Sequence, residues 1–132
     1  MRSKVIWLDR GWQPLFIGFC PDEAAWRREV KRLGCPDTAY PTSDGCVTYF
    51  EGGEDHGACC IVTLNRSEGR DDVVVAGLLV HEAVHVWQHV KAKMGESEPS
   101  WEFEAYSVQA IFQQLYQAHH GRCAALSTEP KS

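Results

Sequence analysis

The sequence lacks long apolar runs and blocks of basic residues, and each absence excludes a class of protein. No apolar run approaches the length of about 18 residues that spans a bilayer, and the apolar stretch at residues 5–8 is too short for a signal peptide. The formal net charge is -5 without any Lys/Arg cluster, so nothing in the composition attracts nucleic acid or an anionic membrane. We therefore expect a cytoplasmic protein that binds neither.

The sequence also has no CxxC pair, which argues against a zinc knuckle built from cysteines. An even number of cysteines in a short chain is compatible with three disulfides, but without an export signal we expect buried free thiols. The adjacent Cys59 and Cys60 lie in a predicted strand, where neighbouring side chains point to opposite faces. The six cysteines are Cys20, Cys35, Cys46, Cys59, Cys60 and Cys123.

What is present is the composition of one globular domain, with 44% hydrophobic residues in a chain of 132. We expect a single domain over residues 1–126 and a flexible tail over 127–132. Asp22 and Asp71 are candidate helix N-caps, and Gly34, Gly95 and Gly121 are candidate helix ends. The order of elements predicts an α+β fold with a small, mainly antiparallel sheet. The predicted strands are 12–20, 46–51 and 58–65, and the predicted helices are 21–34, 72–94 and 101–120.

The pentapeptide HEAVH, residues 81–85, is the strongest chemical signal in the chain. On a helix, His81 and His85 stand one turn apart on the same face, where two imidazoles can bind one metal ion. Glu82 lies about 100° round the helix, beside the open position of the metal, and can act as a base. The surrounding sequence is apolar on nearly every side, which predicts a buried helix. The alternative is a pair of core histidines that are hydrogen-bonded to other protein groups.

Two further residues follow on the same helix. His89 lies about 80° round the helix from His81 and one turn beyond His85, so we interpret it as a supporting residue and not as a ligand. Gln88 lies only about 20° from His81 and can hydrogen-bond a ligand from below.

A catalytic zinc site needs a third protein ligand. In the next predicted helix, Glu104 shares an apolar stripe with Trp101, Ala105, Val108, Ile111, Phe112 and Leu115. Burial of a carboxylate in such a stripe is unfavourable unless a positive charge or hydrogen bonds stabilise it, and zinc would supply the positive charge. Glu102 faces the opposite side, where the helix dipole explains it. Glu96 and Glu98, in the connecting turn, are competing candidates.

The spacing from HEAVH to Glu104-Ala105 resembles the gluzincin branch of zinc metallopeptidases, in particular small zincin-like proteins of phages and mobile elements. The resemblance covers residues 71–120 well and the N-terminal half only in the order of its elements. It implies one Zn²⁺ per chain on His81, His85 and Glu104, with Glu82 as general base in the hydrolysis of a peptide or protein. It also implies a sheet whose edge strand holds the substrate; by position that strand would be 58–65.

The sequence departs from the larger members of that branch at two points. They carry an aspartate where this chain has Val108, and they carry a tyrosine or histidine that stabilises the oxyanion. Tyr40, Tyr49 and His56 are the residues that folding could bring to that role. The alternative hypothesis is therefore a zinc-stabilised module that binds a peptide or protein with little or no cleavage.

Overall fold

The computed structural model describes residues 2–127, and its centre is a mixed sheet of four strands in the order β1-β2-β4-β3. The two outer pairings, β1 with β2 and β3 with β4, are antiparallel, and the central pairing of β2 with β4 is parallel. The predicted α+β class is thus confirmed, although the sheet is mixed. The strands are β1 (Ile6–Trp7), β2 (Phe16–Cys20), β3 (Gly45–Phe50) and β4 (Cys59–Leu64).

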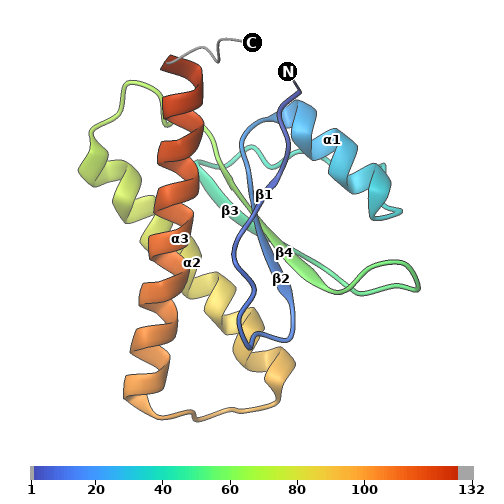
Figure 1. The fold of residues 1–132 in the computed structure, drawn as a ribbon, viewed down its shortest axis with the longest axis vertical. Helices are drawn as coiled ribbons and strands as arrows, with labels where there is room; N and C mark the ends of the chain where they lie inside the picture. Colours follow the sequence, from blue (N-terminus) through green and yellow to red (C-terminus); the bar gives the residue numbers. More distant parts are fainter. Residues whose placement is uncertain (1, 128–132) are drawn as a thin grey trace.

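Helices cover both faces of the sheet (Figure 1). One face packs against α2 (Asp72–Met94) and α3 (Trp101–Ser127), and the other packs against α1 (Glu23–Arg32). Because side chains alternate along a strand, Cys60 belongs to the core under α2 and α3, while Cys59 belongs to the core under α1. The prediction that these two cysteines face opposite sides is confirmed.

Local sequence explains most of the helix ends. The carboxylate of Asp22 accepts a hydrogen bond from the backbone N–H of Ala25 at 2.8 Å, and Asp71 accepts one from Val73 at 2.8 Å. Gly95 ends α2 in the left-handed conformation, with φ of 78°.

The prediction that Gly121 ends the last helix is wrong, since α3 continues to Ser127. Glycine costs a helix interior only about 1 kcal/mol, and Gly121 is not among the glycines with positive φ. Ser127, predicted as the start of a flexible tail, is thus the last residue of α3, and the rest of that predicted tail, 128–132, lies outside the described residues.

Two predictions about the strands also need correction. The short strand β1 was not predicted, because two residues carry no periodic pattern. The strand predicted as the sheet edge, 58–65, is the internal strand β4, and the edge beside α2 is β3. All six residues of β4 are buried, as expected of a strand with neighbours on both sides and helices on both faces.

The motif helix α2 is not buried on all sides, contrary to the expectation from its composition. The sheet and α3 cover only part of its surface, so His81 and His85 are exposed together with Val73, Val74, Val80 and Val84. By length and composition alone α2 could cross a membrane. This is weak evidence for a membrane span, because the core helices of soluble proteins meet the same criteria. Of the most apolar window of α2, 39% is buried inside the protein.

The cysteines are mostly as expected. Within the part of the chain whose side chains are described, Cys20, Cys59 and Cys60 are buried free thiols. Cys46 is half-buried and Cys35 is exposed, so for Cys35 the prediction of burial is wrong. The side chain of Cys123 lies outside the described residues.

Candidate metal and catalytic site

The first helical turn of the motif brings two imidazole nitrogens together at the surface of α2. Nε2 of His81 lies 3.2 Å from Nε2 of His85, and the two rings are inclined at 76°. Two nitrogen ligands of a tetrahedral zinc ion, each about 2.05 Å from the metal, are about 3.3 Å apart. The observed separation therefore fits a shared metal ion with little movement of either ring.

Gln88 supports this arrangement from the next turn. Its side-chain oxygen lies 2.9 Å from Nδ1 of His85 and accepts a hydrogen bond when that nitrogen carries the proton. In this tautomer the lone pair of His85 is on Nε2, which faces His81. The predicted hydrogen bond between Gln88 and a candidate ligand is thus present, with the Gln88 oxygen as acceptor, and it orients His85 as the outer partners of metal-bound histidines do.

Glu82 is placed on the side of α2 that faces the sheet. It is 4% exposed, and burial raises the pKa of its carboxyl group, while the nearby imidazoles of His81 and His85 oppose the shift. Its close neighbour is Gly45 at the start of β3, where an added Cβ would lie 2.6 Å from the carboxylate oxygen Oε2. A residue without a side chain at position 45 therefore leaves room for Glu82.

Glu104 is not brought to the two histidines. Its carboxylate accepts a hydrogen bond from the indole N–H of Trp87 at 2.7 Å and lies 3.5 Å from Nζ of Lys91. The hydrogen bond from Trp87 is the main cause that lowers the pKa of Glu104, and Lys91 adds to it. Glu104 is thus satisfied by two protein groups on a neighbouring side of α2.

The predicted apolar stripe of α3 is buried only in part, and this explains the position of Glu104. Ile111 and Leu115 are buried, but Trp101 is 88% exposed and the side chain of Glu104 is 36% exposed. Phe103 in the first turn of α3 packs against Trp87 of α2 and Trp12 of the N-terminal segment. This cover does not extend over Trp101 or Glu104, so helical phase alone overstated their burial. Glu96, Glu98 and Glu102 are also exposed, and Glu98 shares a hollow at the α2–α3 turn with Glu104 and Lys91. Among the described residues, no three His, Cys, Asp or Glu side chains are grouped to hold a metal ion.

The edge strand β3 contacts the motif helix through Tyr49, and the sequence alone did not predict this contact. The ring of Tyr49 stacks on His89, with centroids 5.1 Å apart and planes inclined by 2°. His89 is therefore held against the sheet, which suits the supporting role predicted for it. Tyr40 packs against Trp26 under α1, and His56 lies in the β3–β4 loop. Of the three candidates for oxyanion stabilisation, Tyr49 packs on the motif helix through His89.

No protein-family model matches the chain, and comparisons with curated proteins and with solved structures find no match. The functional argument therefore depends on the residues and their arrangement.

Proposed function

We propose that this protein is a zinc-dependent hydrolase of peptide bonds. The observation that carries the proposal is the separation of 3.2 Å between the two exposed Nε2 atoms, with a buried carboxylate on the adjoining residue. His81 and His85 would hold the metal, and Glu104 remains the proposed third ligand. It would have to leave Trp87 and Lys91 to reach that position.

The residues of this chain supply the proton chemistry. Bound zinc would provide positive charge and a water whose pKa is lowered to about 7. Glu82 would take the proton from the attacking water and later deliver it to the amine that leaves. Because burial raises the pKa of Glu82, its carboxylate is a stronger base than an exposed glutamate and can also return the proton.

The edge strand β3 supports a peptide substrate. It runs beside α2, and the backbone N–H and C=O groups on its outer side have no neighbouring strand in the sheet. An extended peptide could pair with these groups and lie along the histidine side of α2. We therefore propose β3 in place of β4 as the strand that holds the substrate.

One observation favours the second candidate, a zinc-stabilised binding module without turnover. Tyr40 packs against Trp26 under α1 and His56 lies in the β3–β4 loop, which leaves the proposed site with fewer groups that could stabilise an oxyanion.

Two measurements test the proposal. Zinc content is measured for the wild type, Glu104→Ala and the matched control Glu102→Ala; one zinc per wild-type chain and its loss with Glu104→Ala alone are expected. Hydrolysis of an unbiased peptide mixture is then followed by mass spectrometry, and Glu82→Gln should retain zinc and lose about 10²- to 10⁴-fold in rate. Zinc without hydrolysis in the wild type would favour the binding module, and a wild type that takes up no added zinc would reject both candidates.

A further inference from the structure

A second candidate site lies on the other side of the sheet, under α1. The structure has a cavity of about 590 Å³ between the N-terminal segment, the end of α1 and the β3–β4 loop. Its volume is in the range of small-molecule sites. Phe16 and Cys59, which line it, come from the ends of β2 and β4, and the cavity shares no lining residue with the histidine site. The argument that follows does not depend on the proposed metal.

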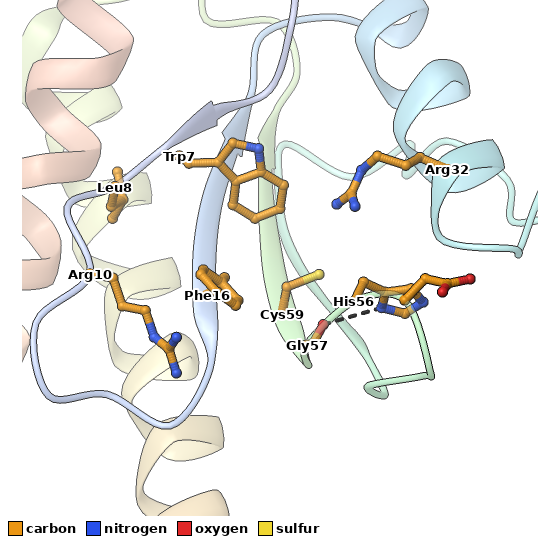
Figure 2. A pocket seen from close by; sticks show the side chains of 9 residues that line it. Trp7, Leu8, Arg10, Phe16, Arg32, His56, Gly57 and Cys59 are labelled. Carbon is orange, nitrogen blue, oxygen red and sulfur yellow. Dashed lines mark hydrogen bonds between the residues drawn. The ribbon is translucent and has the colours of Figure 1, made fainter.

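Two aromatic rings form the apolar surface of this cavity. Trp7 and Phe16 meet edge to face with centroids 6.4 Å apart, and each remains 38% exposed (Figure 2). Two glycines make room for them. A Cβ on Gly18 would lie 3.0 Å from the Trp7 ring, and a Cβ on Gly57 would lie 2.9 Å from the Phe16 ring. The absence of a side chain at Gly18 and Gly57 therefore lets both rings lie against the backbone, and each ring keeps exposed surface for a ligand.

Two arginines flank this apolar surface. Arg10 and Arg32 stand on opposite sides of Trp7, Phe16 and Cys59 (Figure 2). The lining also has one carboxylate, Asp55, and Arg32 is paired with Glu29 beside the cavity.

The two arginines are held differently. Two nitrogens of Arg32 are bound to Glu29, which neutralises much of its charge. The guanidinium of Arg10 lies 4.2 Å from the centroid of the Phe16 ring, and Arg10 forms no ion pair with any residue that the structure describes. Among the described residues, its Nε donates a long hydrogen bond of 3.3 Å to the backbone oxygen of Gln13. Arg10 is thus the cation that is available to a ligand.

We propose that this cavity binds a small aromatic anion, with the ring of the ligand on Trp7 and Phe16 and its acidic group on Arg10. The flat rings supply stacking surfaces, and a guanidinium beside an aromatic ring is a favourable partner for a carboxylate. The thiol of Cys59 at the back of the cavity is neutral, since burial raises its pKa to about 11, and it does not repel an anion.

The probes are 2-naphthoate, its neutral analogue 2-naphthylmethanol and its cationic analogue 2-naphthylmethylammonium. Each is titrated into the isotopically labelled full chain, and the indole N–H signal of Trp7 and the amide signals of Gly18 and Gly57 are followed by NMR. We expect 2-naphthoate to shift these three signals and to bind at least about tenfold more tightly than either analogue.

Matched variants identify the cation. Arg10→Gln should weaken 2-naphthoate binding about tenfold, since one charged hydrogen bond is lost. Arg27→Gln removes an exposed arginine of α1 that is paired with Glu23 outside the cavity, and it should leave the affinity unchanged. Equal binding of the three probes, absence of shifts at the three reporters, or equal losses in the two variants would overturn the proposal.

Discussion

The two faces of the sheet present different chemistry, yet both rely on a glycine in a strand. On the α2 face, Gly45 leaves room for the carboxylate of Glu82; on the α1 face, Gly18 leaves room for the ring of Trp7. The α2 face offers nitrogen ligands and a buried acid, whereas the α1 face offers aromatic surface and an unpaired arginine. The comparison shows that a missing Cβ can determine which side chain approaches the backbone closely.

The largest expected effect is on zinc affinity, and it distinguishes His85 from His89 on α2. His85→Ala removes a proposed ligand and should lower zinc affinity more than about 100-fold, beyond the usual effect of losing an outer partner. His89→Ala is the matched control, because His89 stacks on Tyr49 and is not a proposed ligand. Isothermal titration with zinc distinguishes them, and equal losses in the two variants would contradict the assignment. Binding of 2-naphthoate on the α1 face should not change in either variant.

The second prediction compares the two glycines directly. Gly45→Ala and Gly18→Ala should each lower the free energy of unfolding by about 1–3 kcal/mol, because the new Cβ meets an atom at 2.6 Å in one case and 2.7 Å in the other. Chemical denaturation measures both. Only Gly45→Ala should slow peptide hydrolysis, and only Gly18→Ala should weaken 2-naphthoate binding. The comparison between the faces fails if each variant affects both sites.

The third prediction concerns the adjacent cysteines, which lie on opposite faces. Burial raises the pKa of Cys59 to about 11 and that of Cys60 to about 12. Because the thiolate is the reactive form, both buried thiols should be alkylated much more slowly at pH 8 than exposed Cys35, and the fully buried Cys60 should be the slower of the two. Mass spectrometry of the native protein treated with iodoacetamide measures both rates, with exposed Cys35 as the fast reference. Equal rates at Cys59 and Cys60 would show that opening of the fold controls both.

The smallest expected effect tests the pairing of Glu104. Lys91→Met removes a cation 3.5 Å from the carboxylate, so Glu104 becomes more available to a metal. Zinc affinity should increase by about two- to fivefold, which is the range for a weak surface ion pair. Lys93→Met, which changes an exposed lysine of the same turn, should have no effect. Weaker zinc binding in Lys91→Met would indicate that Lys91 assists the site.

The sequence by itself determined the elements that depend on local chemistry. Asp22, Asp71 and Gly95 marked helix ends through hydrogen bonds and backbone conformations that need no distant contact. The spacing of His81, His85 and Gln88 placed them on one helical face, because they are separated by three or four residues.

Only the tertiary structure decided what covers each face of these elements. Helical phase assigned Glu104 to a buried stripe, but its side chain is 36% exposed and its carboxylate lies with Trp87 and Lys91. Likewise, β3 became the edge strand and Gly45 the neighbour of Glu82 because β4 inserted between β2 and β3. These contacts join residues that are far apart in the chain. They depend on the order of the strands in the sheet, and the residue pattern within one strand does not specify that order.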